Sequence, residues 1–292
     1  MKVGYLKILA VLMMLASAPA FAGKSVDESW DIDADASIYI ENIAGNIEVQ
    51  GWNKNKARLT GELGDSVDEL EISASDSRLQ ISVSNRNERN VDNTELKLMV
   101  PSGASVDATA VSADIDVAGL DNEKLTASSV SGNVNANATS RRVSIESVSG
   151  DVEFIGYTVR ISAESVSGDI DLSGVSGEVS ATTVSGDMDL KAGTIESGKF
   201  ETVSGDMNAV AEVSGNGKIS AESMSGDVVI VLPASQSGVF KAQSFSGRIS
   251  TDFGSVERAK HGPGSHLKYV AGDGGAEIRV ESFSGNIKLK SD

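Results

Sequence analysis

The chain has 292 residues, a formal net charge of −17, 4% aromatic residues and no cysteine. Without cysteine, a disulfide framework and a lipid-modified N-terminal cysteine are both excluded. The negative charge disfavours nucleic acid and anionic lipid as direct partners, because both would be repelled. The composition therefore favours a soluble protein whose partners are cations or basic molecules.

Residues 1–22 have the features of a secretory signal peptide. Two lysines precede a short apolar stretch at residues 8–18, which is followed by Ala-Phe-Ala ending at Ala22. We expect cleavage between Ala22 and Gly23, which removes both lysines and changes the net charge from −17 to −19. The apolar stretch is shorter than the roughly 20 residues of a membrane-spanning helix, and no later segment approaches that length. The sequence therefore predicts an exported protein, periplasmic or secreted to the cell surface, with no transmembrane segment in its mature part.

Residues 23–117 follow a less regular pattern than the rest of the chain. Apolar and polar residues alternate over 37–50, 56–63, 79–83 and 96–100, which predicts a strand in each range. We expect this region to form the N-terminal coils and the cap of a repetitive β-structure.

Residues 118–292 are dominated by a six-residue motif. Its clearest copies read Ser-Val-Ser-Gly-Asp followed by an apolar residue. The motif glycines, which we expect to be turn residues, are Gly132, Gly150, Gly168, Gly186, Gly205, Gly226, Gly247 and Gly285. Most successive glycines are 18 to 21 residues apart, and alternating residues on either side predict two short strands in each period. One such coil cannot bury its apolar side alone, so the predicted fold is an all-β parallel solenoid of about 18–21-residue coils.

The sequence predicts a structural role for several positions of the motif. We expect the glycine to adopt a positive φ, and the flanking Ser and Asp to bond to local backbone groups. We expect the Asp column to be a solvated row of turn residues rather than a cation ladder, because Asn133, Arg248 and Asn286 occupy the same position. The second motif residue is expected to form an internal apolar column, which consists of Val130, Val148, Val166, Val184, Val203, Met224, Phe245 and Phe283.

The 38-residue step between Gly247 and Gly285 contains an insertion at residues 251–276. We expect the surplus residues to leave the stack as a loop. The segment gathers basic and aromatic residues, and loops on rigid scaffolds commonly carry binding residues. Partner contact and a tolerated surface insertion are both open interpretations, and a metal site is disfavoured because the two histidines lack a third ligand. The candidate contact residues are Phe253, Arg258, His261, His266, Lys268 and Tyr269.

Several segments of the chain, in the order in which they occur, resemble a known family. Residues 40–52, residues 96–104, the series of Val-Ser-Gly-Asp motifs and the closing residues 278–287 are similar to the bacterial putative-adhesin family of β-strand-repeat domains of unknown function. The resemblance spans residues 36–290. It implies a β-solenoid fold and an envelope or surface location, and it supplies no catalytic residues.

The sequence favours a non-catalytic structural or interaction module that binds an envelope protein or a glycan and needs no cofactor. The alternative is a carbohydrate-active or cation-dependent β-solenoid. Carbohydrate-active sites combine carboxylates, basic residues and aromatic platforms on one face, and this chain has few aromatic residues. Its many Ser-Gly pairs read as turns rather than as the nucleophile elbow of a hydrolase. Self-association through the ends or edges of the rod stays open.

Overall fold

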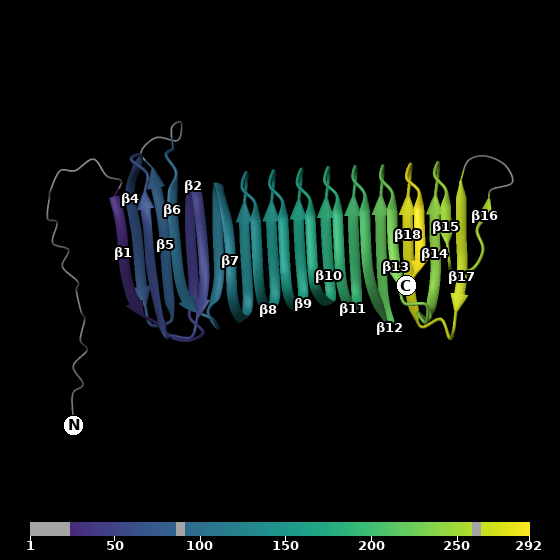
Figure 1. The fold of residues 1–292 in the computed structure, drawn as a ribbon, viewed down its shortest axis with the longest axis horizontal. Helices are drawn as coiled ribbons and strands as arrows, with labels where there is room; N and C mark the ends of the chain where they lie inside the picture. The colour runs from purple at the N-terminus through teal and green to yellow at the C-terminus, as the bar shows by residue number, and fades with distance from the viewer. Residues whose placement is uncertain (1–23, 86–90, 259–263) are drawn as a thin grey trace, which may run out of the picture.

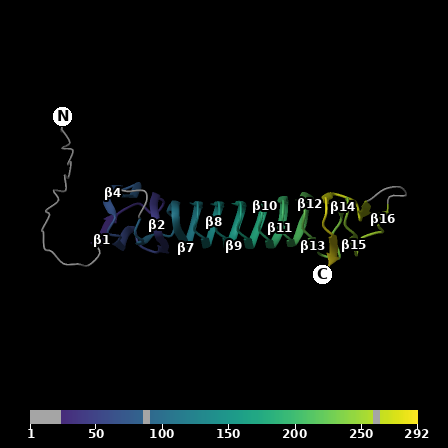
Figure 2. The ribbon, with the colours of Figure 1, turned by 90° about the horizontal axis from the view of Figure 1, so that it is seen from above.

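All regular secondary structure in the computed structural model is β-strand, within the described residues 24–85, 91–258 and 264–292. The predicted signal peptide and its cleavage position between Ala22 and Gly23 lie outside the described residues. The strands lie side by side in one long row, which forms a flat rod (Figure 1) that stays straight and narrow when seen from above (Figure 2). The strands are β1 (Lys24–Asp31), β2 (Ser37–Trp52), β3 (Lys56–Leu63), β4 (Val67–Ser75), β5 (Arg78–Asn85), β6 (Thr94–Pro101), β7 (Ser105–Ser129), β8 (Val134–Ser147), β9 (Val152–Ser165), β10 (Ile170–Thr183), β11 (Met188–Thr202), β12 (Met207–Ser223), β13 (Val228–Leu232), β14 (Gly238–Ser244), β15 (Ile249–Thr251), β16 (Glu257–Arg258), β17 (Ser265–Ala271), β18 (Ala276–Ser282) and β19 (Ile287–Ser291).

The middle of the rod is a stack of parallel coils. β9 pairs in parallel with β8 and β10, so that Val152 lies between Val134 and Ile170 of the neighbouring coils. Buried and exposed residues alternate along each side of the coil, and Phe154 and Ile161 point into the core. Burial of each such side chain contributes about 1.5–3 kcal/mol. The predicted β-solenoid is confirmed, and its core is one continuous column inside the rod.

The second motif residue faces solvent, whereas the sequence predicts that it faces the core. Ser165 is buried, whereas Val166 is 44% exposed, so the predicted internal column of second motif residues is wrong. The Ser165 hydroxyl accepts a hydrogen bond from the Gly168 N–H (2.9 Å) and donates one to the Gly150 carbonyl (3.1 Å). The inside of the bend requires a small side chain that satisfies these backbone groups, which a valine cannot do. The valine is therefore turned outward.

The motif glycines are required by close packing and not by a positive φ. None of these eight glycines, all within the described residues, has a positive φ. A Cβ atom on Gly168 would instead stand well inside van der Waals contact of the Gly150 carbonyl oxygen, and the same contact recurs from one coil to the next. Any larger residue would push neighbouring coils apart at the bend.

The fifth motif residue links each coil to the next. The backbone N–H of Asp169 donates to the Asp151 carboxylate (2.9 Å), and the N–H of Asp187 donates to the Asp169 carboxylate (2.7 Å). Asn133 takes part in the same way, because its side-chain oxygen accepts from the Asp151 N–H. The exposed Asp column is therefore a row of backbone caps, which explains why Asn can occupy the same position.

The last coil of the chain lies inside the stack and not at its end. β18 pairs in parallel with β12 on one side and with β14 on the other, and β19 pairs with β13 and β15 in the same way. The bends follow the same order, because Gly285 packs on Gly226 and Gly247 packs on Gly285. Figure 1 shows the yellow β18 next to β13 and β14. The coil built from β14 and β15 is thus separated from β12 and β13 by the C-terminal residues.

Antiparallel strands close both ends of the rod. At the N-terminal end, β4 pairs with β5, and β3 pairs with both β6 and β1. At the other end, β17 pairs along the whole of β14 and carries β16 on its other edge. The insertion at 251–276 is therefore not simply a loop, because residues 265–271 form a strand that caps the last coil.

Replacement of a motif glycine should strongly destabilise the rod. We expect Gly168→Ala to lower the free energy of unfolding by about 2–3 kcal/mol, because the new Cβ meets a backbone carbonyl that cannot move aside. Gly215→Ala is the matched control, since its Cβ would meet no atom within 4 Å, and it should change stability by less than about 0.5 kcal/mol. Urea unfolding followed by circular dichroism measures both values. Equal losses would contradict the close contact between bends.

The coil order predicts which segments unfold together. Ile287 is fully buried in β19, so Ile287→Asp should release residues 276–291. β14 and β15 then lose their parallel neighbours, and β17, which pairs with β14, should be released with them. Lys290→Ser, on the exposed side of the same strand, is the control. Hydrogen–deuterium exchange should rise in residues 238–251 and 265–271 of the first variant and stay low in β8 to β10. Faster exchange confined to 276–291 would argue against this dependence.

Candidate interaction surface

The outward-facing second motif residues form an exposed row along one edge of the rod, which we call the apolar edge. Their exposed fractions lie between 40% and 56%. Contiguous exposed apolar side chains of this kind are uncommon on soluble proteins and mark interaction sites more often than single exposed residues do. In spatial order the apolar edge consists of Val130, Val148, Val166, Val184, Val203, Met224, Phe283 and Phe245.

The apolar edge becomes larger and aromatic toward its C-terminal end. The rings of Phe245 and Phe283 are stacked, with centroids 4.9 Å apart and an angle of 8° between their planes. Phe283 is held beside the preceding coil because its N–H donates to the Ser223 carbonyl (3.1 Å), and Met224 is the adjacent residue of that coil. The insertion of the C-terminal coil into the stack therefore brings together three side chains that are distant in sequence.

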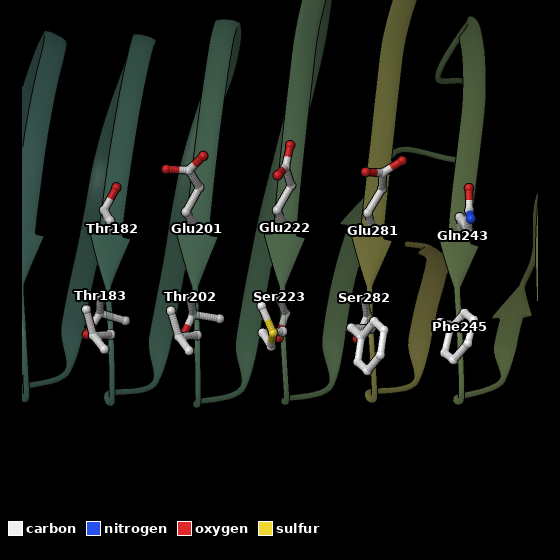
Figure 3. Close-up of a pocket in the computed structure, with 14 residues that line it drawn as sticks. Thr182, Thr183, Glu201, Thr202, Glu222, Ser223, Gln243, Phe245, Glu281 and Ser282 are labelled. Carbon is white, nitrogen blue, oxygen red and sulfur yellow. The ribbon is translucent and has the colours of Figure 1, made fainter. Parts of the chain in front are cut away.

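A row of polar side chains runs parallel to the apolar edge, and we call it the acid row because five of its eight members are glutamates. Each member lies two residues before an edge residue, on the outer side of the strand that leads into the bend. Figure 3 shows Glu201, Glu222 and Glu281 side by side on adjacent strands, with Gln243 in the outermost coil. The pairing register aligns the row through Ser128, Glu146, Glu164, Thr182, Glu201, Glu222, Glu281 and Gln243.

The acid row and the apolar edge line a long shallow groove. One hollow of about 550 Å³ extends from Thr182 to Phe245, and a second of about 470 Å³ extends from Thr109 to Val184. Both hollows include Thr182 and Val184, so they form one continuous surface along the rod.

Basic side chains offset part of the negative charge beside the groove, because the pairing register aligns Lys199, Arg279, Lys241 and Lys268 next to the acid row. Lys199 donates to Glu201 (2.7 Å), and this hydrogen bond is the main reason why the pKa of Lys199 is raised. Arg279 forms an ion pair with Glu281 at 2.8 Å. Within the described part of the chain, Glu146, Glu164 and Glu222 form no ion pair, although the charges of Glu222 and Glu164 also raise the pKa of Lys199.

The opposite broad face is acidic but has no comparable apolar row. Partial burial, followed by the charges of Asp189 and Glu153 on the adjacent coils, raises the pKa of Asp171 there. Large exposed apolar residues on this face, such as Ile155 and Val210, are separated by polar residues of the coils between them. Carboxylates thus occur on both faces, whereas their combination with a continuous apolar edge belongs to one.

The two aromatic residues of the insertion, which the sequence predicts as partner contacts, belong to the end cap. Phe253 is buried, and its ring stacks on Phe240 with centroids 4.6 Å apart. The ring of Tyr269 lies 6.2 Å from that of Phe240. Phe253 is therefore a core residue and not an accessible contact, and the aromatic group seals the last coil.

Two polar residues of the insertion lie beside the outermost coil of the groove, because His266 pairs opposite Gln243 and Lys268 pairs opposite Lys241. His266 faces Glu257 across β16 and β17 at 3.4 Å, and Lys268 is exposed on β17. Arg258 lies in β16, where its backbone pairs with Ser265. His261 lies outside the described residues. Of the predicted contact side chains that the structure describes, His266 and Lys268 share the exposed side of β17, and their role in partner contact stays a prediction.

Two further observations concern the described residues as a group. Among residues 24–85, 91–258 and 264–292, no three His, Asp or Glu side chains are placed to hold a metal ion together. The same residues include no helix long and apolar enough to span a bilayer.

Comparison with known proteins identifies the fold of the rod. The family model described as Toastrack DUF4097 matches residues 28–290, and this match confirms the resemblance expected from the sequence. Among solved structures, the chain is similar to a putative adhesin from Bacteroides fragilis at 14% identity, with 92% of this chain and 98% of that chain covered and a TM-score of 0.47. It is also similar to a putative cell adhesion protein from Clostridium sporogenes (12% identity, 92% and 100% covered, TM-score 0.25). A third similar structure is a putative lipid binding protein from Parabacteroides distasonis (13% identity, 92% and 98% covered, TM-score 0.34). No curated protein matches the chain.

The outward orientation of the apolar edge can be tested with charge substitutions. Val166→Asp should change the melting temperature by no more than about 2 °C, because the new carboxylate stays in water. Ile170→Asp, four residues later and fully buried, should unfold the neighbouring coils. Thermal unfolding followed by circular dichroism compares the two variants. A large loss for Val166→Asp would show that this residue faces inward.

Proposed function

The chain belongs to the Toastrack DUF4097 family, and we propose that it is a non-catalytic exported envelope protein that binds a protein or glycan partner along its groove. The observation that carries the proposal is the continuity of the apolar edge over eight stacked coils. Nothing in the packing of the coils requires these side chains, because each points away from the core.

The repetitive geometry suits binding better than catalysis. A catalytic site needs a unique set of groups held around one reacting atom, whereas here most coils offer the same pair of an acidic and an apolar side chain. Covering one half-exposed valine contributes about 0.5–1 kcal/mol, so a partner must contact several coils to be held. An elongated partner lying along the rod satisfies this condition.

The proposed location in the envelope is supported by the sequence. The signal peptide predicted at residues 1–22 would export the chain, and the absence of cysteine agrees with a rod stabilised by packing and hydrogen bonds alone. Anionic lipid headgroups are disfavoured as direct partners, because the glutamates of the acid row would repel them.

Site-specific crosslinking in cells tests the proposed function. A photoreactive amino acid at Val184 or Val203, both on the apolar edge, should crosslink to an envelope component, because a bound partner covers these positions. The same amino acid at Val210, equally exposed on the opposite face, is the matched control and should give no such product. Crosslinking that is absent at the edge, or equal at Val210, would refute the groove as the binding surface.

A further inference from the structure

The C-terminal coil occupies a slot between two coils that precede it in the sequence. On one side of the rod β18 lies between β12 and β14, and on the other side β19 lies between β13 and β15. The ladders of β18 and β19 are therefore formed with strands between residues 218 and 251. The segment fills the slot with the buried side chains of Ala276, Ile278, Val280, Ser282, Ile287 and Leu289.

The slot makes contacts that the shared motif alone does not supply. Asn286 stands at the fifth motif position, and its backbone N–H and its side-chain amide both donate to the Asp227 carboxylate, at 2.8 and 2.9 Å. Its side-chain oxygen accepts a hydrogen bond from the Arg248 N–H (3.1 Å). An ionised Asp has no N–H to donate, so the common form of the motif could not make the side-chain bond to Asp227. Together with the stack of Phe283 on Phe245, these contacts favour this segment over the other motif copies.

Only a short turn connects the segment to the rest of its own molecule. Residues 272–275 join β17 to β18, and Gly272 and Gly274 have positive φ. β14 lies between these two strands, so the turn crosses about 10 Å, whereas an extended chain of this length reaches about 17 Å. The Ser237 hydroxyl holds the turn, because it donates to the Asp273 carboxylate (2.6 Å) and accepts from the Asp273 N–H (3.1 Å). The ladders of the segment itself do not involve this turn.

We propose that the slot also accepts residues 276–292 of a second copy, so that two chains exchange their C-terminal coils. This inference goes beyond the proposed function and does not depend on it. Exchange of an identical element is a low-cost route to a dimer, because the element makes the same contacts in either molecule. Residues 218–251 are synthesised before the segment that fills the slot, so the slot can be filled by whichever C-terminal segment reaches it.

Exchange would make each groove a product of two chains. Phe283 lies between Met224 and Phe245 along the apolar edge, so in an exchanged dimer this position is filled by Phe283 of the partner subunit. The dimer would present two such grooves on linked rods. An elongated partner that contacts both grooves is held more tightly than by one groove, because the second contact is intramolecular.

Refolding at increasing protein concentration tests whether exchange occurs. The full mature chain is unfolded in urea and refolded, and light scattering after size exclusion should show a dimer whose fraction rises with concentration. Ser237→Ala should raise the dimer fraction at least about threefold, because the lost bonds to Asp273 form only when the turn folds back into its own molecule. Ser235→Ala, an exposed position in the same loop, is the matched control. A monomer at every concentration, or an equal response to both substitutions, would overturn the proposal.

Engineered disulfides test whether the C-terminal coil makes the dimer contact. The chain has no cysteine, so one chain can carry only Val229→Cys and another only Lys288→Cys. These residues are register partners on β13 and β19, and the spacing of neighbouring strands suits a disulfide. After the two chains are refolded together and oxidised, a disulfide-linked heterodimer should form, because β19 of one chain lies in the slot of the other. Mass spectrometry of the joined peptides identifies the bond.

Two controls make the disulfide result decisive. Ser162→Cys in one chain and Ser180→Cys in another are register partners on β9 and β10 in the middle of the rod, and they should give less than about a tenth of the heterodimer. Val229→Cys and Lys288→Cys in one chain should form the bond within the monomer. Equal heterodimer yields from the two pairs would show that chains associate through another contact. A bond that forms within one chain but never between chains would show that each segment always returns to its own slot, and either result would overturn the proposal.

Discussion

The contact between successive bends determines most of this structure. A glycine at position four of the motif lets each bend rest on the carbonyl group of the one before, and the buried Ser or Thr hydroxyl completes the hydrogen bonds of the bend. Because a small polar side chain must occupy the inside of the bend, the next residue must point outward. The outward direction of the edge residues is thus a consequence of the way in which the coils stack, and their regular spacing follows from the glycine contact, whereas their apolar character is not required by either.

The insertion of the C-terminal coil links the stability of one end to the candidate site. β18 and β19 provide the parallel neighbours of β14 and β15, and the same insertion places Phe283 between Met224 and Phe245. The aromatic end of the groove therefore exists only when the last residues of the chain have joined the stack. Formation of this part of the surface requires contacts between residues about 60 positions apart, such as Asp227 and Asn286.

The alternation of apolar and polar residues predicts the strands and the core of this chain better than it predicts the bends and the order in which the coils stack. The expected strand at 56–63 has the observed bounds, and residues such as Phe154 face inward as alternation requires. The prediction fails for Val166 because residues 166–168 form a bend, where a period of two no longer describes side-chain direction. It also fails for residues 276–291, because the six-residue motif is the same in every coil and does not specify which coils are neighbours. The sequence does not predict the acid row as part of a surface, because its position matters only when the second motif residues face solvent.

An exposed apolar edge of this length needs protection from self-association. Apolar surface that is not buried adds little to the stability of the rod and favours aggregation. The acid row lies two residues away from the edge along its length, so two rods that approach through their edges also bring glutamates together. This repulsion is strongest where the glutamates form no ion pair, as at Glu146 and Glu164, and weaker where Lys199 and Arg279 are bound to the neighbouring glutamates.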